Sequence, residues 1–447
     1  MDSPNQPPAR GGFPSRVVYP EKNSADDPSS YLNASYTVRA TCRVCGSPDL
    51  APLFSLGEQY VSNFVPYDQV GTGPKCPIDL QLCRNCTLVQ QRCTAPQELL
   101  YTRHYWYHSG ITQTMRDALR NVTEAAERLV DLKPGDVVLD IGCNDGTLLR
   151  SYTAPGIYRV GVEPAENLQE EGSKGVDLLL KNFWSESVYS CAMGYTNDQS
   201  KARVITAIGC FYDLENPNQF IADVAKVLHP EGVFIAQLMC LKQMLALGDV
   251  GNLVHEHLEF YSLRSLETLF SRHGLRIFRI EENTVNGGSY RLYARHNISV
   301  KDVERNSVEL FQLEEGAGLN EPETYRRWFT RSQRNRDRCA GFIRQQVAAG
   351  KRVWIYGAST KGNVLLQWYG LDCNLIGAAA DRSPEKWGRY TIGTGIPIRS
   401  NEDFRAANPD YALVLPYAFR EEFLQLEQDW RNKGGKFIFP LPEFEVV

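Results

Sequence analysis

Short apolar segments alternate with helix-length amphipathic segments through much of the chain. Four continuous apolar runs lie between residues 97 and 330, at 137–141, 158–162, 204–208 and 232–237. Short buried strands that alternate with helices are typical of a parallel sheet covered by helices. We therefore expect a doubly wound α/β domain over residues 97–330, with a further strand at 290–294.

The same alternation returns in the last part of the chain, residues 331–447. It predicts three more strands, at 352–356, 375–379 and 411–415. A turn at 357–360 precedes a helix that is expected to begin near Lys361. These features indicate a second Rossmann-like α/β domain. The arginine-rich stretch 326–338 is interpreted as a solvent-exposed helix that joins the two domains.

The first residues follow a different pattern. Residues 1–37 are rich in Pro, Ser, Asn and Asp and have no apolar period, so a disordered or loosely docked tail is expected there. Residues 38–96 contain short apolar segments that can form only a small core. A metal is therefore expected to contribute to the folding of this N-terminal module.

Four cysteines supply the candidate metal ligands of this module. They form two CxxC pairs, Cys42 with Cys45 and Cys83 with Cys86, separated by residues 46–82. Two such pairs are typical of a closed, tetrahedral structural Zn²⁺ site. Further thiols in the module, at positions 76 and 93, are alternative ligands that fit the pattern less well.

Composition narrows the classes of partner. The chain has a net charge of −5 and no basic patch of the kind that binds nucleic acid. It has no apolar run near the ~18 residues of a membrane span and no secretory signal at its start, so no membrane partner is expected. Twelve cysteines in 447 residues are too sparse for a disulfide scaffold, which favours a reducing, cytoplasmic location.

A glycine-containing loop follows the strand at 137–141 and is the candidate cofactor site. Asp140, Gly142, Asn144 and Gly146 belong to this loop, and Glu163 ends the next strand. Glycines at a strand-to-helix turn let the backbone approach a ligand closely, and a carboxylate after the second strand can accept ribose hydroxyls.

Two cofactors fit a loop of this kind, a dinucleotide or S-adenosylmethionine (SAM). Asn144 stands where a dinucleotide loop has its second glycine, and Asp145 places negative charge where a pyrophosphate would lie. SAM has no phosphate and carries positive charge, so the loop favours SAM. Asn182 and Phe183 follow the third strand and are expected beside the adenine, although ordinary packing would also explain them.

The segment His255-Glu256-His257 carries the catalytic candidates. A zinc protease motif is excluded, because HExxH places its histidines four residues apart on a helix. In a strand-like segment His255 and His257 would share one side and Glu256 would lie on the other. A histidine beside a carboxylate is a natural general base, whereas the alternative is a polar loop with two hydrogen-bonded histidines.

Five motifs occur in a fixed order along the chain and carry a family resemblance. They are the two cysteine pairs, Tyr105-Trp-Tyr107-His108-Ser109-Gly, Asp140-Ile-Gly142-Cys-Asn144-Asp-Gly146, His255-Glu256-His257 and Gly357-Ala-Ser-Thr-Lys361-Gly-Asn363. Over about residues 38–447 the chain resembles the three-domain sugar C-methyltransferases, which act on nucleotide-linked keto-deoxyhexoses. The resemblance implies a zinc-binding module, a central class I methyltransferase domain and a C-terminal Rossmann-like domain.

The resemblance also implies a reaction. A histidine base removes a proton beside a sugar keto group, and the resulting enolate attacks the methyl group of SAM. His257 matches the base, Glu256 a carboxylate that contacts or orients the sugar, and Tyr107 a hydroxyl that hydrogen-bonds the enolate oxygen. The neighbouring His108 and Ser109 are expected to contact substrate, and the zinc is expected to be structural.

The resemblance further assigns the nucleotide part of the substrate to the C-terminal domain. Lys361 and Asn363 match the family's turn, and a lysine at a helix start is a reasonable diphosphate contact. A purely structural turn is the alternative. Asn286, before the strand at 290–294, belongs either to a hairpin turn or to a loop that lines the sugar pocket.

One departure from the family leaves the acceptor open. Better-known members have a tyrosine three residues before the catalytic histidine, where this chain has Val254. Tyr212 and Tyr261 are candidate replacements for the missing hydroxyl. The alternatives are therefore a methyltransferase that acts on oxygen, nitrogen or a non-sugar carbon, and a zinc-module binding protein with an inactive core.

Overall fold

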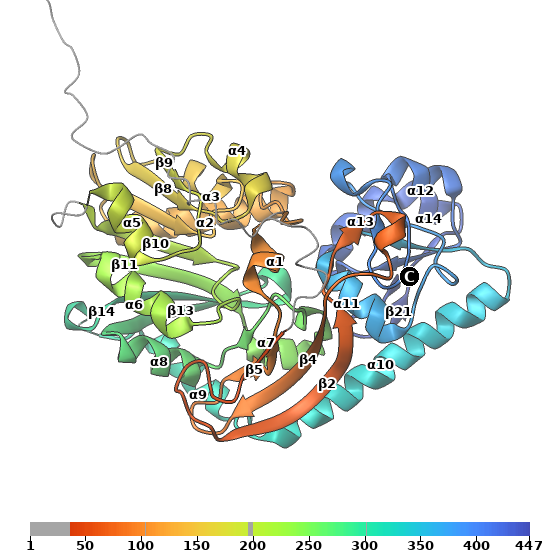
Figure 1. Cartoon of the computed structure of the whole chain (residues 1–447), viewed down its shortest axis with the longest axis horizontal. Helices are drawn as coiled ribbons and strands as arrows, with labels where there is room; N and C mark the ends of the chain where they lie inside the picture. Colours follow the sequence, from red (N-terminus) through yellow and green to blue (C-terminus); the bar gives the residue numbers. More distant parts are fainter. Residues whose placement is uncertain (1–35, 103, 195–199, 301) are drawn as a thin grey trace, which may run out of the picture.

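Three β-sheets with their own helices organise the chain (Figure 1). The computed structural model describes residues 36–102, 104–194, 200–300 and 302–447. The predicted N-terminal tail, 1–37, therefore lies almost entirely outside the described residues. Within the described ranges, no helix combines the length and the apolar character that crossing a membrane requires.

The central sheet has seven strands in the order β13-β14-β11-β10-β7-β8-β9. Strand β14 runs antiparallel to both of its neighbours, and the other pairs are parallel. The strands are β7 (Val137–Ile141), β8 (Tyr158–Val162), β9 (Leu178–Leu180), β10 (Ala202–Ile208), β11 (Leu228–Met239), β13 (Leu275–Asn283) and β14 (Ser289–His296). The apolar runs thus form the predicted parallel sheet, and the loops after β7, β8 and β10 meet at its carboxyl edge.

Helices accompany this sheet. They are α2 (Gln113–Leu129), α3 (Thr147–Arg150), α4 (Gln169–Gly172), α5 (Glu186–Met193), α6 (Pro217–Val227), α7 (Leu241–Leu247), α8 (Leu263–Arg272) and α9 (Arg305–Glu315). The amphipathic ones, such as α2, α6 and α8, bury apolar side chains against the sheet. Helix α8 begins at Leu263, with the Ser262 side chain accepting the Ser265 N–H. This start fixes the chain direction just after the His255–His257 segment.

The N-terminal module forms a four-stranded antiparallel sheet in the order β12-β5-β4-β2. Its strands are β2 (Leu50–Tyr60), β4 (Lys75–Cys83), β5 (Val89–Gln91) and β12 (Glu259–Phe260). The short strands β1 (Thr37–Val38) and β6 (Cys93–Thr94) pair beside it, and α1 (Gln97–Tyr101) follows. Strand β12 comes from the middle of the chain, so the methyltransferase region supplies one strand of the module's sheet.

The C-terminal sheet has six strands in the order β18-β16-β15-β19-β20-β21. Its strands are β15 (Val353–Tyr356), β16 (Ala379–Ala380), β18 (Ile398–Arg399), β19 (Tyr411–Val414), β20 (Lys436–Phe439) and β21 (Glu445–Val446). Its helices are α11 (Thr360–Tyr369), α12 (Asn401–Ala407), α13 (Arg420–Leu426) and α14 (Gln428–Asn432). The strand predicted at 375–379 is wrong in its start, because Leu375 and Ile376 donate to the Asp372 carbonyl and so remain in a turn.

Helix α10 (Pro322–Ala348) connects the central and C-terminal sheets and contains the predicted arginine-rich stretch. It runs along the outer side of the long strands β2 and β4 (Figure 1). Phe54 of β2 packs against Trp328 and stacks on Phe329, with ring centroids 5.5 and 4.2 Å apart. The helix therefore also supports the N-terminal module.

The N-terminal module contacts the C-terminal sheet directly. Strand β3 (Phe64–Val65) pairs with β17 (Tyr390–Thr391). The Asn363 amide donates to the Asn63 carbonyl at 2.7 Å, and Arg389 donates to the Phe64 carbonyl at 3.3 Å. The module thus packs against both other parts of the chain.

Candidate functional site

A cavity of about 590 Å³ lies at the carboxyl edge of the central sheet. Ligand sites of doubly wound folds form at this edge. The residues that line it come from the central sheet and its loops, from the segment that follows the N-terminal module and from loops of the C-terminal sheet. They include Tyr101, Tyr105, Tyr107, Ser109, Gly142, Asn144, Glu163, Phe183, Tyr212, Asp213, Val254, Glu256, His257, Asn286 and Lys361. The cavity therefore brings together ten of the residues that the sequence singled out for cofactor or substrate chemistry, namely Tyr107, Ser109, Gly142, Asn144, Glu163, Phe183, Glu256, His257, Asn286 and Lys361.

The loop after β7 forms the cofactor wall of this cavity. Gly142 has φ +71°, and a Cβ added there would lie 3.1 Å from the Cys210 sulfur. Glu163, at the end of β8, accepts hydrogen bonds from the backbone N–H groups of Asn144 at 2.9 Å and Ala165 at 2.8 Å. Burial raises the pKa of Glu163 to about 7, against the lowering effect of these two bonds. A bare backbone beside a fixed carboxyl fits the ribose and amino-acid parts of SAM.

Three other predicted cofactor residues do not line the cavity. Asp140 is buried in β7, accepts a hydrogen bond from the Thr206 hydroxyl at 2.6 Å, and has a pKa raised to about 7 by burial. Gly146 caps α3 with φ +76°, and a Cβ there would lie 2.9 Å from the Gly172 carbonyl oxygen. Asn182 accepts the Phe183 N–H at 2.8 Å. The contacts of these three residues are therefore with other parts of the protein, next to the residues that line the cavity.

The segment 107–110 is held against the cofactor loop by two side chains. Asn144, with φ +53°, accepts the Ser109 N–H at 2.9 Å and donates to the Tyr107 carbonyl at 3.0 Å. Asp145 accepts the Gly110 N–H at 2.6 Å. Tyr107 and Ser109 consequently line the cavity, whereas the His108 ring points to Glu385, with Nε2 3.8 Å from the carboxylate.

Residues 254–257 form a tight turn, in which the His257 N–H donates to the Val254 carbonyl at 3.1 Å. The expectation of a strand-like segment is wrong here, because β12 begins only at Glu259. His255 therefore points away from the cavity, with Nε2 3.0 Å from the Cys76 carbonyl and a pKa lowered to about 4 by burial. Glu256 and His257, expected on opposite sides, both line the cavity.

His257 is oriented by a backbone carbonyl. Its Nδ1 lies 2.8 Å from the Asn252 carbonyl oxygen, which can only accept, so Nδ1 carries the proton and Nε2 the lone pair. Burial and the nearby Lys361 charge lower the pKa of His257 well below its usual value. The Tyr212 ring meets the imidazole edge to face, with centroids 4.7 Å apart. At pH 7 His257 is therefore a neutral imidazole whose orientation is fixed by this hydrogen bond.

Acidic side chains surround Lys361 next to this imidazole. Lys361 donates to the Asn252 side-chain oxygen at 2.6 Å, and burial lowers its pKa. Burial raises the pKa of Glu256 to about 7 and that of Asp213 well above its usual value. In the described part of the chain, Glu256 Oε2 and Asp213 Oδ1 are buried without a hydrogen-bond partner. Leaving such atoms unpaired is costly, so they suit polar groups of a bound substrate.

The two remaining predicted substrate contacts differ in their surroundings. Asn286 has φ +53° and lies in the hairpin between β13 and β14, where it also lines the cavity. Asn286 therefore lies in a hairpin turn that also lines the cavity, and its contact with a sugar stays a prediction. Asn363 is buried against the N-terminal module, where its amide donates to the Asn63 carbonyl, and it does not line the cavity.

Several cavity residues were not singled out from the sequence. Tyr101 lines the cavity and donates its hydroxyl to the Glu256 carbonyl at 2.8 Å. Asp213 follows β10 at the carboxyl edge of the sheet. This position in the sequence could have identified it, because ligands of doubly wound folds bind at that edge. Of the two proposed tyrosine replacements, Tyr212 lines the cavity, whereas Tyr261 is buried and stacks on Phe211 at 5.4 Å.

The four paired cysteines form a metal-binding cluster. All four sulfur atoms lie within 4.8 Å of one another, and the Cys42–Cys86 and Cys45–Cys83 sulfur pairs are each 3.5 Å apart. Each CxxC turn is closed by a backbone bond, from Gly46 N–H to the Cys42 carbonyl and from Thr87 N–H to the Cys83 carbonyl. Four converging thiols fit a closed tetrahedral Zn²⁺ site, and Cys76 and Cys93 lie outside it.

Comparisons with known families cover nearly the whole described chain. Residues 42–101 match a zinc binding domain, 111–280 a methyltransferase domain, and 284–442 a C-methyltransferase C-terminal domain.

Among characterised proteins, the C-methyltransferase NovU of Streptomyces niveus is 31% identical over 409 residues, 91% of this chain and 96% of the relative. The 27-O-demethylrifamycin SV methyltransferase of Amycolatopsis mediterranei is 26% identical over 33% of this chain and 50% of its own length. A solved SAM-dependent methyltransferase from Clostridium acetobutylicum is 15% identical, with a TM-score of 0.30 over 40% of this chain and 91% of its own.

Proposed function

Because the chain belongs to the three-domain family of SAM-dependent C-methyltransferases, we propose that it methylates a carbon beside the keto group of a nucleotide-linked deoxysugar. The observation that carries this proposal is the state of His257. Its Nδ1–H donates to the Asn252 carbonyl at 2.8 Å, which leaves the Nε2 lone pair for proton abstraction at the cavity. Because the imidazole is neutral at pH 7, its lone pair is available to accept a proton, which a general base requires.

The proposed reaction assigns a role to each polar group near the base. His257 Nε2 takes the proton, so that the C–H electron pair moves onto the keto oxygen and forms an enolate. The Tyr107 hydroxyl donates to that oxygen, and Glu256 hydrogen-bonds a sugar hydroxyl. When bound, SAM would supply the electrophilic methyl group: the enolate carbon would form the new C–C bond as the methyl–sulfur bond breaks, and S-adenosylhomocysteine would leave as a neutral thioether.

The cofactor and the nucleotide are assigned to different walls of the cavity. Gly142, Asn144, Glu163 and Phe183 would hold SAM, with Glu163 accepting its ribose hydroxyls. Lys361 lies at the start of α11 in the opposite, C-terminal wall and is assigned to the sugar nucleotide. Zn²⁺ would stay structural, because four cysteines leave it no open coordination position.

A second candidate function is favoured by Val254. This residue is 1% exposed and lines the cavity where better-known relatives have a tyrosine. An apolar side chain there suits a substrate that has no polar group facing this position. Such a substrate would be another small molecule, methylated on an oxygen, a nitrogen or a non-sugar carbon. Tyr212, in contact with the His257 ring, supplies a hydroxyl if the sugar reaction is retained.

The substitution His257→Ala tests the proposed base. We expect turnover to fall by about 10²–10⁴-fold while SAM affinity, measured by calorimetry, stays within about twofold. Washout of deuterium from the substrate carbon, with no methyl transfer, should disappear as well. His273→Ala is a matched control, because that ring lies at the end of α8 and bonds to Asn218, outside the cavity.

Two results would redirect the assignment. Turnover near the wild-type rate in His257→Ala would contradict the base. Absence of deuterium exchange with every keto sugar nucleotide, together with methylation of another acceptor, would support the second candidate.

A further inference from the structure

The zinc-binding module contributes the strand that lies directly beside the catalytic turn. Strand β12 starts two residues after His257 and pairs with β5 of the module, with Glu259 opposite Gln90 and Phe260 opposite Val89. The chain therefore leaves the turn as an edge strand of the module's sheet, and not as a strand of the methyltransferase sheet. The position of His257 depends on where β5 lies.

Gln91, the last residue of β5, bonds both ends of the turn. Its side-chain nitrogen donates to the Val254 carbonyl at 2.5 Å and to the His257 carbonyl at 2.8 Å. Its backbone N–H donates to the Leu258 carbonyl at 2.9 Å. Gln91 is fully buried, so water cannot replace these bonds without rearrangement.

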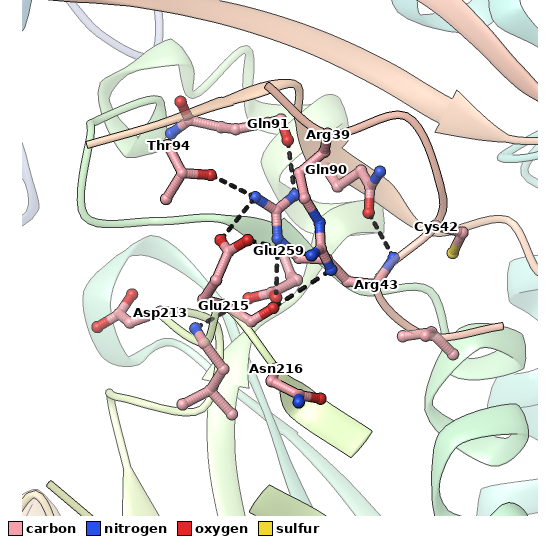
Figure 2. Close-up of polar contacts among 12 residues, drawn as sticks. Arg39, Cys42, Arg43, Gln90, Gln91, Thr94, Asp213, Glu215, Asn216 and Glu259 are labelled. Carbon is pink, nitrogen blue, oxygen red and sulfur yellow. Dashed lines mark hydrogen bonds and ion pairs between the residues drawn. The ribbon is translucent and has the colours of Figure 1, made fainter. Parts of the chain in front are cut away.

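Arg43 connects this arrangement to the metal cluster (Figure 2). It lies between the ligands Cys42 and Cys45, and its side chain is fully buried. The guanidinium donates to the Gln91 carbonyl at 2.6 Å and to the Thr94 hydroxyl at 2.6 Å. Its backbone N–H donates to the Gln90 side chain at 2.9 Å. The first CxxC turn is thus bonded to the last two residues of β5, Gln90 and Gln91.

The same guanidinium reaches the wall of the cavity (Figure 2). It donates to the Glu215 carboxylate at 3.1 Å, and its Nε lies 3.8 Å from the Glu259 carboxylate. Glu259 in turn accepts the Leu214 N–H at 3.2 Å. Leu214 and Glu215 both line the cavity, so Arg43 contacts the loop after β10 as well as the segment that follows the catalytic turn.

We propose that Gln91 and Arg43 are positioning residues for catalysis, through which the zinc-binding module holds the turn 254–257 and the His257 ring in place. The inference rests on the proposed role of His257 as the base. It adds a specific function for the module, which would otherwise serve only to pack over the cavity. A displacement of about 1 Å at a reacting group can cost about 10²-fold in rate, so loss of two bonds to the turn is expected to lower kcat.

Gln91→Met tests the inference, because it removes both side-chain bonds and preserves the length of the side chain. We expect kcat to fall by about 10–100-fold, with SAM affinity and bound zinc within about twofold of the wild type. The matched control is Gln81→Met in β4 of the same sheet. Gln81 is also buried, and among the described residues its amide nitrogen has no hydrogen-bond partner.

Gln91→Glu supplies a readout that a purely structural role would not change. A protonated glutamic acid can still donate one hydrogen bond to the turn, whereas the ionised form would repel both carbonyl oxygens. We therefore expect kcat of this variant to decline as pH rises through the pKa of the new carboxyl. The pH profiles of the wild type and of Gln81→Met should not show this decline. This variant also preserves the test if Gln91→Met fails to fold.

The outcomes separate this inference from the proposed function. A loss of kcat in Gln91→Met no greater than in Gln81→Met, or an unchanged pH profile in Gln91→Glu, would overturn the positioning role. Loss of zinc or of SAM binding in step with kcat would overturn it too, because the effect would then be on folding. Full activity in His257→Ala would instead contradict the base itself, whatever the Gln91 variants do.

Discussion

At the scale of single residues, Glu163 illustrates how a buried carboxyl can be tuned for a cationic ligand. Burial raises its pKa, and the N–H groups of Ala165 and Asn144 partly oppose this, for a resulting value of about 7. Near neutral pH the free enzyme therefore holds this group as a mixture of acid and carboxylate. In the proposed cofactor site, ribose hydroxyls would donate to the carboxylate and the cofactor is cationic, so binding of SAM would favour ionisation.

We predict that SAM binding releases a proton from Glu163. The release should approach one proton per site near pH 6 and fall toward zero above about pH 8, because the free group is then already ionised. Calorimetry in buffers of different ionisation enthalpy measures it. Glu163→Gln should bind SAM more weakly and lose the buffer dependence, and an equal buffer dependence in that variant would assign the proton to another group.

At the scale of elements, several strands of the central sheet were predictable, whereas the turn at 254–257 was not. Strands such as β7 and β8 follow from local apolar runs, which bury the same residues wherever the sheet forms. The turn at 254–257 depends on bonds from Gln91, a residue far away in the sequence, so the alternation of residues gave the wrong sides for His255 and Glu256. The position of a residue at the carboxyl edge of the sheet predicted the cavity residues better than this alternation. It would also have predicted Asp213 as a cavity residue.

The start of α11 affects His257, the proposed base, through charge. The Lys361 ammonium bonds the Asn252 side chain, and its positive charge helps to lower the pKa of His257. We predict that Lys361→Met raises the pKa of His257, which moves the acidic limb of the kcat/KM profile to higher pH. Lys361→Arg keeps the charge and should leave that limb near its wild-type position. A limb that stays in place in Lys361→Met would mean that the lysine charge does not act on the base.

At the scale of the whole molecule, the cavity depends on contacts between all three sheets. The sequence predicted the three parts and the cysteine cluster, because each is encoded by a local pattern. It did not predict that β12 joins the module's sheet or that β3 pairs with β17, since two-residue strands leave no recognisable pattern. These long-range pairs decide which residues meet at the cavity.

Removal of the metal should therefore act on the whole molecule. We predict that Cys83→Ser, or chelation of zinc, lowers the Tm by about 10 °C, which corresponds to a few kcal/mol for units of this size, and lowers turnover with it. After chelation, refilling the wild-type protein with Zn²⁺ or Cd²⁺ should restore both the Tm and the turnover, because the ion supplies no chemistry. Cys93→Ser is the matched control, a buried thiol outside the cluster. Recovery of Tm but not of turnover with Cd²⁺ would instead indicate a chemical role for zinc.

The pairing of β3 with β17 has a consequence for synthesis on the ribosome. The Arg389 side chain and the Phe64 carbonyl that it bonds are 325 residues apart in the chain. At about 5–20 residues per second, translation needs roughly 16–65 seconds to cover that distance. During this time the N-terminal module has emerged without its partner strand β17, so the pairing of Phe64 and Val65 with that strand cannot form until residues 390 and 391 have been made.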